Sequence, residues 1–149
     1  MEWPVRCLVP GTFAQSDPGR DPKTIAQAYT PDSIWRNRSF FLRGTAAIED
    51  FLTKKWEKEK NYRLRKELFA FTENKIAVQF WYEYQDAHDG LKWKRCYGLE
   101  DWTFADNGKM RKRQMSGNDV EIDEAGEIPS SRPGIALTNV CSAMVQEWC

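Results

Sequence analysis

The chain has 149 residues, of which 22 are Lys or Arg and 22 are Asp or Glu, so its formal net charge is zero. This length suits one domain with its own core and is short for two, and a balanced charge gives no electrostatic attraction to nucleic acid or an anionic membrane as the main partner. Aromatic residues make up 13% of the chain, with seven Trp, and they can line a small-molecule cavity as well as fill a core.

The chain begins with an irregular segment and then a short helix. Residues 1–20 contain three prolines and two glycines and keep neither a helical nor a strand period. The stretch DPKTIAQAY (21–29) predicts a helix, with Asp21 as its N-cap and Pro22 at the first helical position. A strand at about 33–38 follows and leads into a loop that closes at Gly44.

A second, longer helix is predicted over 46–60, with Thr45 as its N-cap. Its apolar side chains recur at helical spacing along one stripe: Ile48, Phe51, Leu52 and Trp56. That stripe should pack against the rest of the domain, and Asn61 is expected to end the helix.

Four strands are predicted after the second helix, at 62–71, 76–84, 92–104 and 109–122. Each is followed by a turn rich in Asn, Asp or Gly. These strands exceed the usual ~5–6 residues, so they must twist and bend, and Gly98 and Gly117 are natural bend or bulge sites. Helices followed by a curved four-stranded antiparallel sheet make an α+β fold, in which the sheet can wrap around the helices.

The remaining residues, 124–149, are expected to be a C-terminal appendage, either a docked helix or a loose segment, so the predicted domain spans 21–123. The cysteines lie far apart and form no C-x-x-C pair: Cys7, Cys96, Cys141 and Cys149. No run of residues has the form of a secretory signal or a membrane span. We therefore expect reduced thiols, a cytoplasmic protein and no membrane partner.

Six stretches stand in a characteristic order and spacing: DPKTIAQAYTPDSIWRNR, RGTAAIEDFL, YRLRKELFAF, NKIAVQFWYEY, YGLEDWTF and GKMRKRQMSGNDV. Together, over about residues 21–122, they resemble an uncharacterised family of the nuclear-transport-factor-2-like (NTF2-like) superfamily. The resemblance implies a cone-shaped fold, with a curved antiparallel sheet wrapped around helices and a pocket at the open end. Relatives include ketosteroid isomerase, limonene epoxide hydrolase and SnoaL-like polyketide cyclases, beside members that only bind or scaffold. Family members usually have a long first helix before the segment that begins here at Asp21, and residues 1–20 do not resemble it.

The resemblance also implies which residues face the pocket. Asn37 aligns with the catalytic Asp of ketosteroid isomerase, and Glu100 aligns with the protonated Asp of its oxyanion hole. Strand alternation places Arg113, on the neighbouring strand, on the same face. These three are the predicted catalytic residues, and the predicted substrate-binding residues are Trp35, Phe80, Tyr82, Trp102 and Met115.

Neither relative's mechanism transfers whole to these residues. Asn37 cannot abstract a proton as the carboxylate of the isomerase does, and the positions near Ile76, Val78 and Met115, where the epoxide hydrolase needs ionic residues, are apolar. Burial would raise the pKa of Glu100 and suit a general acid, whereas a nearby Arg would lower it and suit a base or a cation-binding site.

Two functions remain open. One is a cofactor-independent isomerase-, dehydratase- or cyclase-type enzyme that acts on a hydrophobic metabolite. The other is a non-catalytic dimeric ligand-binding or scaffold protein of the same fold, in which Glu100 and Arg113 only join two strands and the Trp residues only fill the core. No cofactor and no metal are expected in either case.

The outer face of the sheet should carry Trp81, Tyr97 and Leu99. This surface is too apolar for water alone, so we expect a second copy of the chain to cover it in a two-fold dimer. Alternation also predicts that Arg36 and Arg38 lie on the outer face and meet acidic residues of a neighbouring strand or subunit. The basic run KMRKR alternates between faces in a strand, which argues against a nucleic-acid site.

Overall fold

The computed structural model describes residues 21–124. The elements in chain order are α1 (Pro22–Ala26), β1 (Tyr29–Asn37), β2 (Phe40–Arg43), α2 (Gly44–Lys58), β3 (Glu59–Phe71), β4 (Lys75–Asp86), β5 (Lys92–Phe104) and β6 (Met110–Glu121). The predicted N-terminal segment 1–20, residues 125–149 of the predicted appendage, and three of the four cysteines lie outside the described residues. The division of the chain into an N-terminal segment (1–20), a domain (21–123) and a C-terminal appendage (124–149) therefore stays a prediction.

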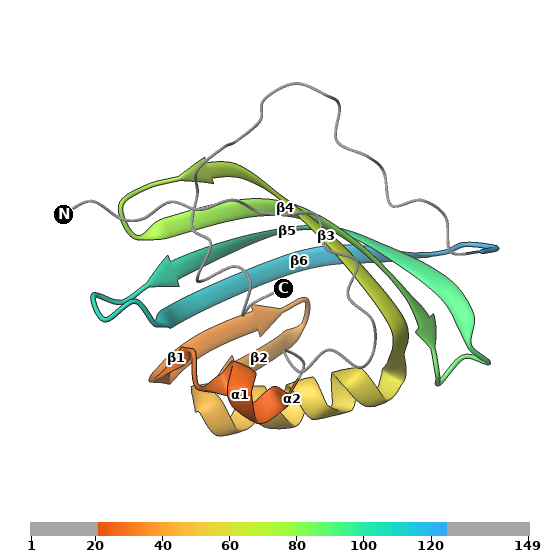
Figure 1. Cartoon of the computed structure of the whole chain (residues 1–149), viewed down its shortest axis with the longest axis horizontal. Helices are drawn as coiled ribbons and strands as arrows, with labels where there is room; N and C mark the ends of the chain where they lie inside the picture. Colours follow the sequence, from red (N-terminus) through yellow and green to blue (C-terminus); the bar gives the residue numbers. More distant parts are fainter. Residues whose placement is uncertain (1–20, 125–149) are drawn as a thin grey trace.

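One curved sheet holds all six of these strands, in the order β2-β1-β6-β5-β4-β3. Strands β3 to β6 form the predicted antiparallel meander, and β1 joins it parallel to β6. Figure 1 shows the sheet curving over the two helices, which lie together beside β1 and β2. The α+β class is confirmed. The expected loop before Gly44 is wrong in part, because it contains strand β2, which pairs with β1 as a hairpin.

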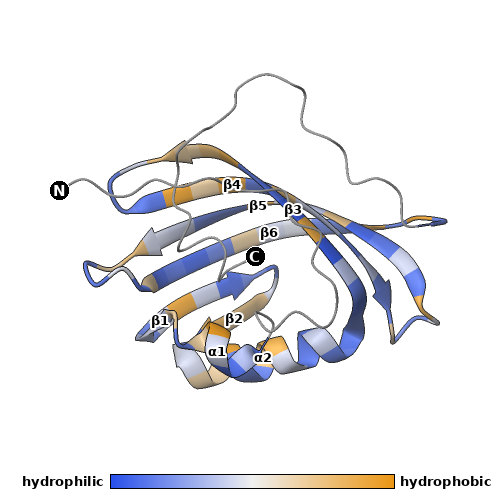
Figure 2. Cartoon of the chain, in the orientation of Figure 1, coloured by the Kyte–Doolittle hydropathy of each residue, from blue (hydrophilic) through white to orange (hydrophobic). Residues whose placement is uncertain are grey.

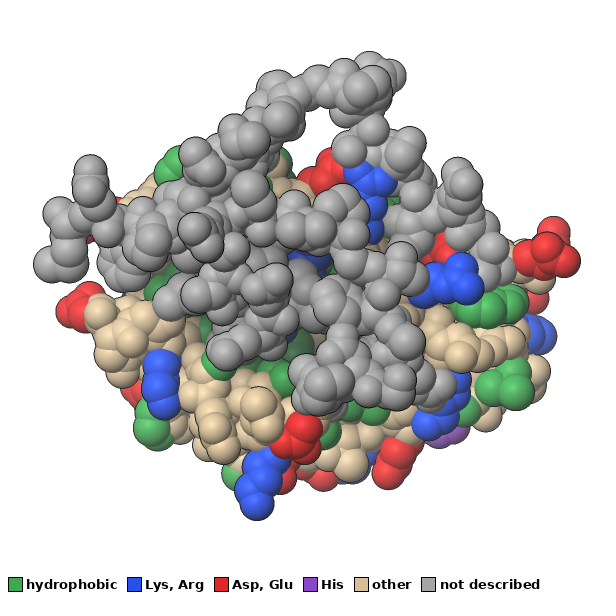
Figure 3. Space-filling model, viewed as in Figure 1, with side chains coloured by type: hydrophobic (Ala, Val, Ile, Leu, Met, Phe, Trp, Pro, Cys, Tyr) green, Lys and Arg blue, Asp and Glu red, His purple; other side chains and the backbone are tan. Residues whose placement is uncertain are grey.

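The strands form where the sequence alternates between apolar and polar residues. Along β4, Val78, Phe80 and Tyr82 are buried, and Figure 2 shows hydrophobic and hydrophilic positions exchanging along the strands. Since successive side chains point to opposite faces, this alternation fixes which face packs on the helices. Figure 3 shows acidic and basic side chains interspersed around the edge of the visible face, in keeping with the balanced charge.

The helix ends follow local chemistry. An oxygen of Asp21 accepts a hydrogen bond from the Thr24 N–H at 2.9 Å, as a cap should. Helix α2 begins at Gly44, whose φ of +80° suits glycine. The predicted cap at Thr45 is wrong, because that residue already lies inside the helix and the cap position makes no side-chain hydrogen bond. Asn61, with φ 49°, lies within β3 at a register shift and does not end the helix.

The core lies between the helices and the concave face of the sheet. Ile48 and Leu52 of α2 pack with Trp35, Val78 and Trp102 of the sheet. Neither helix of the described segment has the length and apolar character to cross a membrane.

The two glycines in β5 and β6 have a packing role. Gly98 pairs directly with Gly117, and the register continues through the pair without a shift, so of the expected bend or bulge the bulge is absent there. A Cβ on Gly98 would lie 2.0 Å from the Phe80 Cζ atom. The glycine therefore gives the ring of Phe80 the space it occupies on the concave face.

Candidate functional site

The structure places all eight predicted site residues on the concave face. Cross-strand pairing puts Asn37, Met115 and Glu100 in one row. The neighbouring row contains Trp35, Arg113 and Trp102. Seven of the eight residues are buried, and Arg113 is half-buried.

A first group of side chains, here called the Glu100 cluster, consists of Glu100, Arg113, Lys66, Tyr29, Trp35 and Trp102. The Nε and Nη2 atoms of Arg113 each lie 2.8 Å from Oε2 of Glu100. The Nζ atom of Lys66 lies 2.9 Å from Oε1 and forms an ion pair without hydrogen-bond alignment. The carboxylate of Glu100 thus lies between two cations, and its side chain is 1% exposed.

Aromatic rings surround these charges. The guanidinium carbon of Arg113 lies 4.5 Å from the Trp35 ring centroid, and the Lys66 ammonium lies 4.7 Å from that of Trp102, both within cation–π range. Arg113 also donates a hydrogen bond to the Tyr29 hydroxyl at 3.1 Å. The cluster therefore joins β1, β3, β5 and β6 beneath the helices.

These contacts fix the charge of Glu100. Burial by itself would raise the pKa of Glu100, but the charges of Arg113 and Lys66 outweigh it and hold that pKa at about 2. Glu100 is therefore a carboxylate at neutral pH. Of the two outcomes that the sequence left open, this state is the one that suits a base or a cation-binding site, because a general acid must hold a proton.

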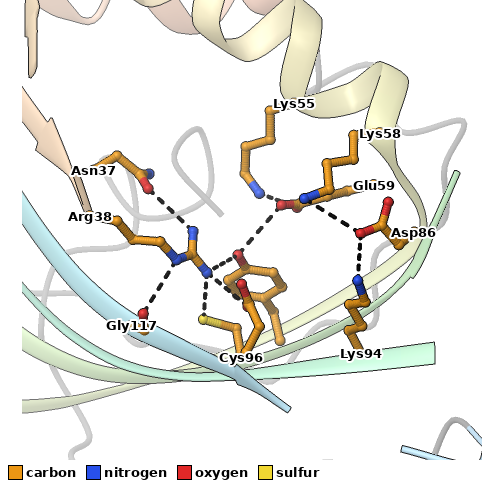
Figure 4. Close-up of polar contacts among 11 residues, drawn as sticks. Asn37, Arg38, Lys55, Lys58, Glu59, Asp86, Lys94, Cys96 and Gly117 are labelled. Atoms are coloured by element: carbon orange, nitrogen blue, oxygen red, sulfur yellow. Dashed lines mark hydrogen bonds and ion pairs between the residues drawn. The ribbon is translucent and has the colours of Figure 1, made fainter. Parts of the chain in front are cut away.

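A second group, here called the Arg38 cluster, consists of Arg38, Tyr82, Cys96, Asp119, Lys55 and Glu59. Arg38 was expected on the outer face, and this prediction is wrong. Its φ of 53° in the β1–β2 turn breaks the strand alternation. The side chain turns inward, as Figure 4 shows, between α2 and the sheet.

Arg38 reaches several partners on the concave face. Its Nη2 atom donates to the Tyr82 hydroxyl at 3.0 Å and to an Asp119 oxygen at 2.8 Å, and lies 3.0 Å from the Cys96 sulfur. A longer contact of 3.4 Å joins Nη1 to the Asn37 side-chain oxygen. Arg38 thus meets an acidic residue of β6, as the sequence predicted, but from the inner side.

Lys55 brings a further charge into this group from α2. Its ammonium forms an ion pair with Glu59 and lies 4.7–5.0 Å from the ring centroids of Tyr82, Tyr62 and Trp56. Burial lowers the pKa of Lys55, although Glu59 opposes this change. In this cluster each cation has its own carboxylate, Asp119 for Arg38 and Glu59 for Lys55.

The predicted catalytic set is divided between the Glu100 cluster and a position beside the Arg38 cluster. Glu100 and Arg113 are in direct contact, whereas Asn37 contacts Arg38. In the sheet, Met115 stands between Asn37 and Glu100, and two strand spacings separate their backbones by about 10 Å. One small ligand would have to lie across Met115 to touch both.

Reasoning from the sequence missed Lys66, Tyr29 and Arg38. Lys66 could have been found from the sequence. It is separated by an even number of residues from Tyr62, Leu64 and Leu68, so it shares their face of the strand, and it is the one charged residue among these apolar positions. Tyr29 had none, because its contact with Arg113 spans 84 residues. Within residues 21–124, no group of three or more His, Cys, Asp or Glu is placed to hold a metal ion.

The outer face of the sheet carries Trp81, Tyr97 and Leu99, as expected. Trp81 pairs across the strands with Tyr97, Tyr97 is 40% exposed and Leu99 is 54% exposed. The dimer that we expect on this surface stays a prediction.

Comparisons with known proteins give a family and a fold. A model of a family described as protein of unknown function (DUF1348) matches residues 14–128. None of the curated proteins compared with the chain is similar enough to match.

Solved structures with the same fold include an epoxide hydrolase/cyclase-like enzyme, SalBIII, described in pyran ring formation in polyether salinomycin (13% identity, TM-score 0.59, covering 66% of this chain and 79% of that one). A protein from Shewanella denitrificans named as a SnoaL-like polyketide cyclase is similar (16% identity, TM-score 0.58, covering 66% of this chain and 79% of that one). An NTF2-like protein of unknown function from an Exiguobacterium species is also similar (9% identity, TM-score 0.58, covering 71% of this chain and 97% of that one). These likenesses confirm the NTF2-like fold.

Proposed function

Because this chain belongs to the DUF1348 family and has the NTF2-like fold, we propose that its concave face binds a hydrophobic small molecule and acts on it as a cofactor-independent isomerase, dehydratase or cyclase. The observation that carries this proposal is the Glu100 cluster. A carboxylate and two cations, buried together among aromatic rings, form the kind of preorganised charge that a reacting centre needs.

Each charged group has a role in the proposal. Arg113 and Lys66 stabilise the negative charge that develops on a substrate oxygen when a neighbouring proton is removed or a ring closes. Glu100 holds both cations in place and accepts the proton. Because its low pKa makes it a weak base, that proton must come from an acidic carbon or hydroxyl of the substrate. Asn37, beside Arg38, orients the distal part of the substrate, and Phe80 contributes apolar contact area between the two clusters.

The same cluster also supports the second function. A carboxylate already paired with two cations is a weak base, and an ion-pair network of this kind can serve only to hold strands together. In that case the protein is a binding or scaffold protein of the same fold. Both versions include a two-fold dimer through Trp81, Tyr97 and Leu99, and a cytoplasmic location.

A metabolite experiment separates the two functions. The full chain is incubated with a small-molecule extract of cells, and mass spectrometry follows both what the protein retains and what disappears from the extract. An enzyme should convert a retained apolar compound to a product of the same mass, or to one that has lost water. A Glu100→Gln variant should retain the compound without converting it.

Asp101→Asn is the matched control, because Asp101 is the next residue of β5 and is exposed on the opposite face. It should convert the compound at the wild-type rate. Retention without conversion by the wild type would leave only the binding function, and full conversion by Glu100→Gln would contradict the role of Glu100.

A further inference from the structure

The Glu100 cluster carries more positive than negative charge. Lys66 and Arg113 share the single carboxylate of Glu100, and the side chains of Lys66 and Glu100 are 3% and 1% exposed. Charge removed from water without a counter-charge costs several kcal/mol. The excess of one positive charge is therefore an unfavourable feature of the cluster as it stands, and an added anion would relieve it.

The Arg38 cluster shows that this imbalance is local. There, Arg38 pairs with Asp119 and Lys55 pairs with Glu59. The two clusters share the concave face, yet only the Glu100 cluster lacks a second acidic group among its described contacts.

The hydrogen-bond donors of the Glu100 cluster point to the same deficit. The indole N–H groups of Trp35 and Trp102 are buried and have no hydrogen-bond acceptor among residues 21–124. An indole nitrogen can only donate, and an unpaired buried donor costs ~1–3 kcal/mol. Both indoles lie within 6.0 Å of the Arg113 guanidinium, measured to their ring centroids. In the described part of the chain, two buried donors of the cluster thus lack acceptors, beside its excess of positive charge, while Glu100 Oε1 is engaged only by the Lys66 ion pair.

We infer that the Glu100 cluster is a recognition site for an aromatic carboxylate, so that the small molecule of the proposed function is an organic acid anion. The inference rests on that function. The carboxylate supplies the missing charge to Lys66 and Arg113, and its oxygens supply acceptors. The aromatic part of the ligand packs beside Trp35 and Trp102, whose rings already stack with cations. The 14% of the Arg113 side chain that stays exposed marks the side from which the anion approaches.

The test uses three probes of one shape: 2-naphthoate, 2-naphthamide and 2-(aminomethyl)naphthalene, which are anionic, neutral and cationic at neutral pH. Binding to the full chain is measured by calorimetry and by the change in Trp fluorescence. The naphthoate should bind about tenfold to a hundredfold more tightly than the amide, as a charge-assisted contact predicts. The amine should bind more weakly than both.

Two variants show where the preference arises. Lys66→Met removes the excess charge and leaves the Glu100–Arg113 pair, so the naphthoate should lose its advantage while the amide binds as before. Lys112→Met is the matched control, because Lys112 is exposed on β6 next to Arg113 in sequence, and it should keep the full preference. If Lys66→Met fails to fold, the order of the three probes on the wild type still decides the inference.

The outcomes separate this inference from the proposed function. Equal binding of the naphthoate and the amide would overturn the anion site and leave a hydrophobic small-molecule site standing. A preference unchanged in Lys66→Met would overturn the assignment to this cluster. If none of the three probes binds, both the inference and the proposed small-molecule function are contradicted.

Discussion

Acidification should remove a defined part of the stability that Glu100 provides. The pKa of Glu100 falls from its ordinary value of 4.5 to about 2 in the folded protein. Each unit of difference between the folded and unfolded pKa is worth ~1.4 kcal/mol, so the ionised side chain contributes about 3 kcal/mol to the free energy of unfolding. Because the folded pKa is the lower one, this contribution is complete above pH 4.5 and is lost as the pH falls towards 2.

The measurement compares urea unfolding of the wild type and Glu100→Gln between pH 7 and pH 2.5, followed by Trp fluorescence. At pH 7 the variant should be ~3–5 kcal/mol less stable, because Lys66 and Arg113 lose their counter-charge. By pH 2.5 the difference should have shrunk by about 2.5 kcal/mol, because the carboxylate takes up a proton at a higher pH in the unfolded chain than in the folded one. Asp101→Asn, on the exposed face, should follow the wild type at every pH.

A second variant keeps the prediction testable if Glu100→Gln is unfolded at pH 7. Lys66→Met leaves Arg113 as the only cation on Glu100, which moves the folded pKa of Glu100 up towards 4.5, so its stability should fall less between pH 4.5 and pH 2.5 than that of the wild type. A gap between wild type and Glu100→Gln that stays constant with pH, or an acid response of Lys66→Met identical to that of the wild type, would refute the reasoning.

Three further predictions concern packing, assembly and reactivity. Gly98→Ala should lower the free energy of unfolding in urea by ~1–3 kcal/mol, because the new Cβ would lie 2.0 Å from the Phe80 ring and 2.6 Å from the Ser116 carbonyl oxygen. Replacing the ring in a Gly98→Ala/Phe80→Leu double variant should recover part of this loss. A Gly98→Ala variant with the urea midpoint of the wild type would contradict the close contact. Leu99→Asp should turn a dimer into a monomer in size-exclusion chromatography with light scattering, and a monomeric wild type at micromolar concentration would end the dimer proposal. Burial raises the pKa of the Cys96 thiol to about 12, so peptide mass spectrometry should find it unmodified by iodoacetamide in the folded protein and modified in urea; rapid alkylation of the folded protein would show that the thiol is accessible and ionised.

The sequence was sufficient to predict the four meander strands and their faces, but not strand β2. A period of two residues assigns every side chain of a long strand to one of two faces, and the burial of Val78, Phe80 and Tyr82 follows that rule. The rule fails where the backbone leaves the extended conformation. Arg38, at φ 53°, is such a place, and one residue in this conformation sends a whole guanidinium to the concave side.

The partners of Glu100 were harder to predict, because they depend on register. Arg113 lies on the adjacent strand, and the turn between β5 and β6 sets its position within a residue or two. Lys66 lies two strands away on the other side, beyond β4, so a register shift in β3 would have moved it. Tyr29 depends on the parallel pairing of β1 with β6, which no turn specifies.

The position of β6 affects the order in which this chain can fold during synthesis. Of the strands between residues 21 and 124, β6 is the last to be made, yet it lies in the interior of the sheet, with β5 on one side and β1 on the other. Until it leaves the ribosome, the β1–β2 hairpin has no strand partner in the meander, and Arg113 cannot reach Tyr29. Contacts between such distant parts of a chain form slowly, because closing a long loop costs entropy before any contact repays it. Chains interrupted before about residue 110 should therefore expose the hairpin and the edge of β5 to chaperones.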